Sequence, residues 1–164
     1  MATDEALKQL VQTISPAQRE MLKQTYQVMN SNPGNHGMGI FARLFQEYPD
    51  YKGLFPRFRY VHDSVLFTTG EFTTFAQLYM NGLRTIIHSL DDDVVLMQTL
   101  EKVAAIHKKK HVETYHLQNM LPMVIATMRS AGATIDEGSE QAWAQLFSVI
   151  AQIIEQMKKQ KRKQ

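Results

Sequence analysis

One histidine lies on the apolar face of a predicted helix, where its ring could bind a metal. Apolar residues recur at helical spacing before it, and His107 continues their stripe. They are Leu96, Leu100, Val103 and Ala104. A neutral imidazole carries one nitrogen with a free lone pair, so a histidine aimed into an apolar pocket can coordinate a metal. The alternative is a core histidine whose ring hydrogen-bonds to the backbone.

A phenylalanine-rich stretch upstream offers an apolar surface that could complete such a pocket. Residues 39–58 read GIFARLFQEYPDYKGLFPRF. The pattern predicts an amphipathic helix that carries Phe41 on its apolar face and ends near Pro49. Phe55 and Phe58 follow this helix within a few residues. The histidine and the aromatic residues are therefore candidates for one apolar, metal-binding site.

The order and spacing of these motifs resemble the globin family. The motifs are FARLF, YPD, GLFPRF, the histidine in AAIHKKKHV and the later AWAQLF, and the resemblance runs from about Ser15 to Met157. The stretch HGMGIFARLFQEYPDYKGLF is most similar to neuroglobin and the invertebrate intracellular globins. The resemblance implies a globin fold and haem b, with His107 as the proximal iron ligand and Phe55 packed flat on the porphyrin.

The resemblance also implies the remaining contacts to the haem. His111 matches a position where some globins place a polar group near a haem propionate, one helical turn beyond His107. Arg57, Arg59 and the lysines at 108–110 are other candidates for the propionates, but a lysine run is typical of a solvated face. The other expected haem contacts are Phe41, Phe58, Phe75, Tyr79, Leu83, Val103, Ile106, Val112, Leu117 and Leu121.

The distal side departs from the usual globin pattern. Phe75 stands where most globins carry histidine, and Phe41, on the preceding helix, is apolar as well. Phenylalanine neither donates a hydrogen bond nor binds iron. Tyr79, one turn beyond Phe75, could restore a donor or simply pack. We expect five-coordinate ferrous iron, with His62 as the nearest internal alternative for a sixth ligand. We expect structural or surface positions for His36, His88 and His116.

The chain divides into three segments around one domain. Residues 1–14 form a short extra helix with Thr3 as its N-cap, 15–157 form the globin domain, and 158–164 form a basic tail. The tail could contact an anionic membrane surface or nucleic acid, or it could be a frayed helix end whose cations suit the helix dipole. No sustained alternation predicts a strand, so the expected class is all-α, with crossing helices.

Capping patterns predict where several helices begin. A helix is expected from about His36 to Tyr48, and residues 63–70 are expected to form a loop. Three pairs are spaced as capping boxes: Ser15 with Gln18, Thr68 with Glu71, and Thr134 with Glu137. These helices must hold the candidate residues around one pocket.

Composition narrows the chemistry. A chain of 164 residues fits one domain, and the absence of cysteine excludes disulfides, thiolate metal sites and cysteine nucleophiles. The balance of 18 basic and 16 acidic residues does not indicate a nucleic-acid partner. No signal-peptide pattern or membrane-length apolar run is present, so we expect a cytoplasmic protein. A homodimer stays open as its assembly.

These observations favour a haem globin that reversibly binds oxygen or another diatomic gas, including carbon monoxide or nitric oxide. It would serve as an oxygen binder, a gas or redox sensor, or an electron-transfer protein. The alternative is a haem-dependent redox enzyme of the peroxidase, nitrite reductase or nitric oxide dioxygenase type. Such turnover needs a positioned acid or base, which Phe41 and Phe75 do not supply, so we do not expect an enzyme. A helical interaction module without haem is disfavoured because His107 and Phe55 are both present.

Overall fold

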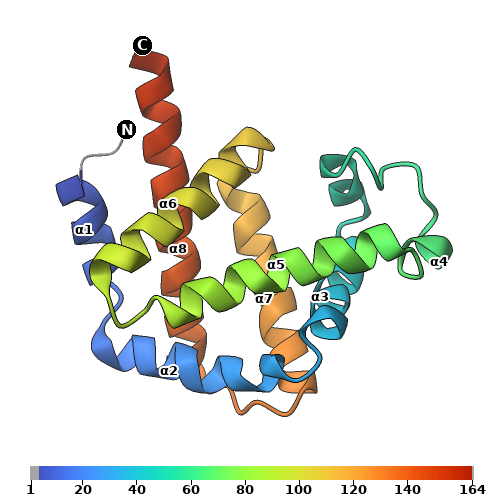
Figure 1. Cartoon of the computed structure of the whole chain (residues 1–164), viewed down its shortest axis with the longest axis horizontal. Helices are drawn as coiled ribbons and strands as arrows, with labels where there is room; N and C mark the ends of the chain where they lie inside the picture. Colours follow the sequence, from blue (N-terminus) through green and yellow to red (C-terminus); the bar gives the residue numbers. More distant parts are fainter. Residues whose placement is uncertain (1–3, 164) are drawn as a thin grey trace.

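The structure is a computed structural model that describes residues 4–163 (Figure 1). Within these residues the regular elements are all helical, as predicted. The α-helices are α1 Asp4–Gln12, α2 Pro16–Tyr26, α3 Pro33–Glu47, α4 Asp63–Leu66, α5 Gly70–His88, α6 Asp93–Lys109, α7 Thr114–Ser130 and α8 Glu137–Lys163. Two short 3₁₀ helices, η1 Gln27–Asn30 and η2 Pro49–Leu54, flank α3.

Helix α8 forms the spine of the molecule. Helices α2, α6 and α7 pack against it, while α3 crosses α5 and contacts α7 on the other side (Figure 1). Trp143 on α8 is fully buried, and its Nε1 donates a hydrogen bond of 2.8 Å to Thr25 Oγ1 on α2. A buried indole needs such a partner, because an unpaired N–H away from water is costly. The helices therefore cross around one shared core, as the all-α prediction required.

A close approach of two helices places the aromatic residues together. Gly37 on α3 lies so near α5 that an added Cβ would stand 2.7 Å from the Ala76 carbonyl oxygen and 2.8 Å from Met80 Cγ. Only glycine permits backbones to approach to this degree. Phe41 is one turn further along α3, and Phe75 is next to Ala76 on α5. The crossing thus brings the two phenylalanine rings into contact, with their centres 5.1 Å apart and their planes tilted by 56°.

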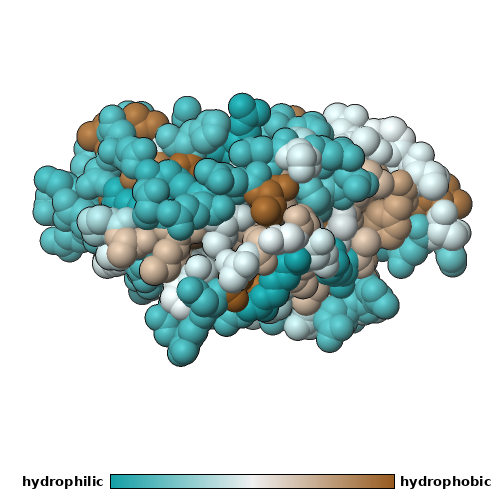
Figure 2. All heavy atoms as spheres, turned by 90° about the horizontal axis from the view of Figure 1, so that it is seen from below, coloured by the Kyte–Doolittle hydropathy of each residue, from teal (hydrophilic) through white to brown (hydrophobic). Residues whose placement is uncertain are grey.

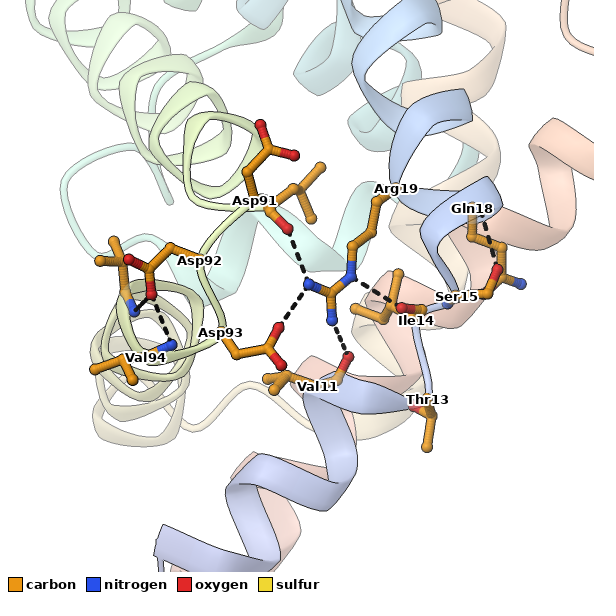
Figure 3. Close-up of polar contacts among 12 residues, drawn as sticks. Val11, Thr13, Ile14, Ser15, Gln18, Arg19, Asp91, Asp92, Asp93 and Val94 are labelled. Carbon is orange, nitrogen blue, oxygen red and sulfur yellow. Dashed lines mark hydrogen bonds and ion pairs between the residues drawn. The ribbon is translucent and has the colours of Figure 1, made fainter.

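The start of α6 is held by Arg19, which lies on α2 (Figure 3). Its guanidinium donates to the carbonyl oxygen of Leu90 at 2.9 Å and to the carboxylate of Asp93 at 2.6 Å. It also donates to the carbonyls of Val11 and Ile14, at 2.7 and 2.9 Å. One planar cation therefore joins the end of α1, the start of α2 and the α5–α6 corner. This clamp fixes the origin of the helix that carries His107.

The leading helix and its junction follow the prediction. Helix α1 packs on α6, with Leu7 and Val11 buried, so the N-terminal extension supports the same helix. Ser15 and Gln18 form the predicted capping box at the start of α2. The predicted cap at Thr3 lies outside the described residues.

Several predicted helix starts were wrong. Helix α3 begins at Pro33 rather than His36, since Asn32 adopts a left-handed conformation (φ 53°) and Pro33 suits the first turn. Helix α5 is capped by Thr69 and not by Thr68. The Oγ1 of Thr69 accepts a hydrogen bond from Phe72 N at 3.2 Å. These errors are shifts of one to three residues, because local side-chain patterns define a cap only approximately.

Two further differences concern a short helix that was not predicted and the N-cap of α8. The expected loop at 63–70 contains α4, a single turn whose N-cap is the ring of His62. At the start of α8 the Asp136 carboxylate accepts from Ser139 N at 2.8 Å, so Asp136 rather than Thr134 caps the helix. A carboxylate is favoured there by the helix dipole.

Helix α8 continues through the predicted basic tail. It runs to Lys163 without a break at residue 157, and the Lys158 ammonium lies 2.8 Å from the Glu113 carboxylate. On the face in Figure 2, hydrophobic residues appear as separate spots among hydrophilic ones. Scattered exposed apolar residues are usual for soluble-protein surfaces and do not by themselves mark an interface. Among the described residues, no helix has the length and hydropathy that crossing a bilayer requires.

Candidate functional site

The ring of His107 is held in one orientation by its own helix. Its Nδ1 lies 2.7 Å from the carbonyl oxygen of Val103, one turn earlier on α6. A carbonyl oxygen only accepts hydrogen bonds, so Nδ1 must carry the proton and donate. In the neutral ring this leaves the lone pair on Nε2, for which the described residues offer no hydrogen-bond partner. The arrangement presents Nε2 as a free donor atom for a metal.

The half-buried setting of His107 keeps its ring neutral. Burial lowers the pKa of the His107 imidazole below its ordinary value. The hydrogen bond to Val103 opposes this shift, and the charge of Lys110 adds to it. A neutral imidazole is the form that binds a metal.

The end of α6 is closed by a Schellman motif directly after His107. Val112 N donates to the His107 carbonyl at 3.0 Å, and His111 N donates to the Lys108 carbonyl at 3.1 Å. His111 takes the left-handed position, with φ 60°. The chain therefore leaves the helix before His111, which is exposed, and the expected contact of His111 with a haem propionate stays a prediction. The turn nonetheless fixes the backbone on which His107 stands.

A group of aromatic side chains on α3, on α5 and on the segment between them forms what we call the aromatic cluster. Its centre is Phe41, whose ring lies 5.9 Å from that of Phe55, 5.1 Å from Phe75 and 5.0 Å from Tyr79. Most of these contacts are edge-on, the geometry that aromatic rings favour. The cluster consists of Phe41, Phe45, Phe55, Phe58, Phe67, Phe72, Phe75 and Tyr79.

Lys110 links the cluster to the histidine. It is the C-cap of α6, three residues after His107, and its Nζ lies 6.0 Å from the ring centre of Phe75 on α5. Its charge also acts on the His107 ring. Helices α5 and α6 share a corner and diverge from it (Figure 1). His107 and Phe75 therefore border the same region between the two helices, with an ammonium group beside them.

Most of the other predicted contacts lie in the same core. Leu83 and Leu117 are buried, while Val103 and Val112 are half-buried and pack against it. Ile106 and Leu121 lie at the edge of this core, and their expected haem contacts stay predictions. The Ile106 side chain is 56% exposed, because it lies about 100° around α6 from the His107 stripe. Leu121 lines an outer groove of about 450 Å³ whose described lining comes from α7 and α8 alone.

Two other histidines, His62 and His116, form local hydrogen bonds at helix starts. His62 is exposed, and its Nδ1 accepts from Ser64 N at 3.1 Å as the cap of α4. His116 accepts from Glu113 N at 2.8 Å and caps α7. These bonds give both rings structural roles, which is what we expected for His116. They offer no support for His62 as a metal ligand.

The sequence matches the family model described as Globin over residues 38–154. The chain belongs to the globin family. This confirms the resemblance inferred from the motifs, and the matched region contains the cluster and His107.

Individual relatives of this globin are distant. It is 21% identical over 147 residues to a globin of Nerita albicilla, an alignment that covers 89% of this chain and 94% of the relative. It is 21% identical to cytoglobin-1 of Oryzias latipes, covering 84% of this chain and 79% of the relative. The relatives found include cytoglobin and invertebrate globins.

A solved structure agrees with the fold. A double mutant of the myoglobin from Aplysia limacina superposes with a TM-score of 0.80 and 17% sequence identity, covering 87% of this chain and 97% of that chain. At this identity the likeness establishes the globin fold, and the chemistry must come from the site itself.

The residues of the site fit a haem. The free Nε2 of a neutral, oriented imidazole is the donor that haem iron takes in globins. Flat aromatic side chains offer the apolar contact that a porphyrin needs, and the Lys110 ammonium could pair with a propionate at the edge. Sequence reasoning named Lys110 only as a secondary candidate, although its i, i+3 spacing from His107 placed it on the same face. It also treated Phe45 and Phe72 as general core.

Proposed function

We propose that this globin binds haem b through His107 and uses it to bind a diatomic gas reversibly. The observation that carries the proposal is the hydrogen bond between His107 and Val103, which leaves Nε2 free. Lys110, at the end of the same helix, lies 6.0 Å from the ring of Phe75 in the aromatic cluster. When bound, the haem iron supplies the coordination position for the gas. The chain's own residues orient the imidazole and exclude water from the region above it.

Exclusion of water by the cluster supports reversible binding over turnover. Phe41, Phe55 and Phe75 bring only hydrocarbon to this region, and oxidation of a haem centre is promoted by water and protons. Among the described members of the cluster the sole ionisable group is Tyr79, and burial raises its pKa well above the ordinary range. A group of this kind is poorly suited to donate protons in each catalytic cycle. We therefore propose a binding protein rather than an enzyme.

The structure supports five-coordinate ferrous iron in this proposal. His62, the nearest alternative ligand by sequence, caps α4 through Nδ1 and faces solvent. Recruiting it would break that cap and move the segment between η2 and α5. A gas can then bind without displacing an internal ligand, which suits storage, sensing and electron transfer alike. A cytoplasmic location, a homodimer and a membrane contact through the end of α8 stay predictions.

Reversible oxygen binding tests this proposal directly. The purified protein is loaded with hemin, reduced, and cycled between air and argon while its absorption spectrum is recorded. We expect a ferrous five-coordinate spectrum under argon and an oxygenated spectrum in air, with full recovery over several cycles. Failure to take up hemin contradicts the haem assignment. Immediate oxidation in every cycle, with turnover of added peroxide, favours the redox enzyme instead.

A further inference from the structure

An open groove lies on the outer side of α7 and α8, which pack side by side (Figure 1). Its volume is about 450 Å³, and none of its described lining residues belongs to the aromatic cluster. Among these residues, Phe147 and Ala151 on α8 are buried and apolar, whereas Ser148 and Gln152 on the same helix are exposed. The groove therefore has an apolar floor that stays open to solvent.

The outer face of α8 is regular along this groove. Its residues recur at intervals of three and four, which places them on one side of the helix, opposite the core residues Leu146 and Ile150. They are Glu137, Gln141, Ala144, Ser148, Gln152, Glu155 and Lys159. The order of the intervals is the same from either end, with Ser148 at the centre. A second copy of α8 that runs antiparallel can therefore match this face position by position.

The charges at the two ends of this face are opposite. Glu137 lies in the first turn of α8 and Lys159 lies near its end, and both side chains are exposed. Within the described part of the chain neither of them forms an ion pair. The adjacent Lys158, in contrast, pairs with Glu113 at 2.8 Å. An antiparallel second copy brings each of the two unpaired charges next to a charge of the opposite sign.

We propose that this face is the interface of a homodimer, in which α8 of one copy runs antiparallel to α8 of the second across a two-fold axis at Ser148. A two-fold axis makes the interface isologous, so that each contact occurs twice. Glu137 of each copy then faces Lys159 of the other. The small side chains of Ala144 and Ser148 stand near the axis and permit a close approach of the two helices.

The dimensions of this face suit a reversible dimer. From Glu137 to Lys159 the helix extends ~33 Å at the usual rise per residue. A strip of this length and two helices wide covers ~650 Å² on each copy, near the lower limit for stable interfaces. The ends of the strip are polar and only the groove floor is apolar. We therefore expect a dissociation constant on the order of 10 µM rather than a permanent dimer.

Sedimentation velocity of the full chain supplied with hemin measures the oligomeric state. For wild type, a chain of 18.9 kDa, we expect mostly dimer at about 100 µM and mostly monomer at about 1 µM. Ser148→Arg places two bulky like charges on the axis and should give a monomer at both concentrations. Lys102→Glu changes an exposed lysine on α6, outside this face, and should behave like wild type.

Two charge reversals test the register of the pair. Glu137→Lys places lysines opposite each other, and Lys159→Glu places carboxylates opposite each other, so each variant alone should dimerise at least about tenfold more weakly. An equal mixture of the two variants should dimerise like wild type, because every facing pair is again of opposite sign. The double variant Glu137→Lys/Lys159→Glu should also recover. Lys102→Glu is the matched control for a reversed charge.

The outcomes decide whether this face is the interface. A wild type that stays monomeric at about 500 µM overturns the inference. A dimer that survives Ser148→Arg, or charge variants that do not recover on mixing, also overturns it. The substituted side chains are exposed, and circular dichroism checks that each variant folds. If Ser148→Arg does not fold, the charge variants decide alone. Failure to bind hemin contradicts the proposed function and leaves this inference standing.

Discussion

Nδ1 of His107 donates a 2.7 Å hydrogen bond to the carbonyl oxygen of Val103, and this single contact decides what the histidine can do. It turns a side chain that is free to rotate into an oriented one, with the proton on one nitrogen and the lone pair on the other. A core histidine bonded to the backbone and a metal-binding histidine were alternatives by sequence. In this geometry one residue can fill both roles, because the hydrogen bond through Nδ1 leaves the lone pair of Nε2 available to a metal.

The tautomer can be measured in the haem-free protein. We expect the ¹⁵N chemical shifts of the His107 ring at neutral pH to show a protonated Nδ1 and an unprotonated Nε2, because the Val103 carbonyl accepts only from an N–H. Assignment follows from loss of these signals in His107→Gln. A ring protonated on Nε2, or exchanging freely between tautomers as exposed His88 should, would contradict this geometry.

The Arg19 clamp should account for a measurable part of the folding stability. Arg19→Ala leaves three backbone carbonyls and the Asp93 carboxylate without their donor, so we expect a loss of about 2 kcal/mol in urea unfolding. Arg59→Ala is the control, because Arg59 is exposed and makes one bond of 3.2 Å to Gly53. That variant should change stability by less than about 0.5 kcal/mol. Equal effects of the two substitutions would show that Arg19 is not a clamp.

The close crossing of α3 and α5 predicts opposite effects for two glycine substitutions. Gly37→Ala places a Cβ 2.7 Å from the Ala76 carbonyl oxygen, so the helices must separate, at a cost of about 1–3 kcal/mol. Gly82→Ala, also within a helix, meets no atom within 4 Å and should be neutral or stabilise by up to about 1 kcal/mol. Thermal unfolding of both variants measures the difference. A Gly37→Ala protein as stable as wild type would mean that the crossing is looser than the structure has it.

The His116 cap predicts a specific dependence of stability on pH. His116 accepts a hydrogen bond from Glu113 N, which requires an unprotonated Nδ1, and burial lowers the pKa of the ring. The Glu113 carboxylate opposes this shift and the Lys158 ammonium adds to it. As the pH falls below the unfolded value of about 6.5, the unfolded chain takes up a proton first, so stability contributed by His116 is present above that pH and is lost below it.

The measurement is the difference in unfolding free energy between wild type and His116→Ala. At pH 8 the variant should be less stable by about 0.5–1 kcal/mol, the usual value of a cap. At pH 5 the difference should shrink, since wild type has lost the contribution. Other histidines cancel because they are present in both proteins. A difference that grows as the pH falls would mean that the protonated ring is the stabilising form.

Sequence patterns predicted the fold and the main residues of the site, because both depend on the periodicity of apolar residues and on the order of the motifs along the chain. The apolar stripe through Leu100 and Ala104 defined the inner face of α6, and His107 followed from it. Phe41, Phe55 and Phe75 came from motif spacing, and the structure brings them together. Caps were less reliable. Thr68 and Thr69 are chemically equivalent, and only the tertiary position of α5 decides which one caps it.

The remaining errors arose where the chain leaves a helix or where packing chooses a face. The turn at His111 was not predicted, because a Schellman turn with a non-glycine residue at positive φ carries little sequence signal. The groove that Leu121 lines was not predicted either, because it depends on how α7 packs against α8, which no local pattern contains. Sequence alone left the role of Tyr79 as donor or packing residue undecided.

The most direct measurement of the central claim is the spectrum of ferrous protein after hemin is added to wild type and to His107→Gly. We predict a five-coordinate, imidazole-ligated spectrum in wild type. The variant should lack it and regain it when imidazole is added, because free imidazole can occupy the space that the side chain leaves. His111→Ala and His62→Ala should retain the wild-type spectrum. A His107→Gly protein that shows the wild-type spectrum without added imidazole would contradict the assignment of His107 as the proximal ligand.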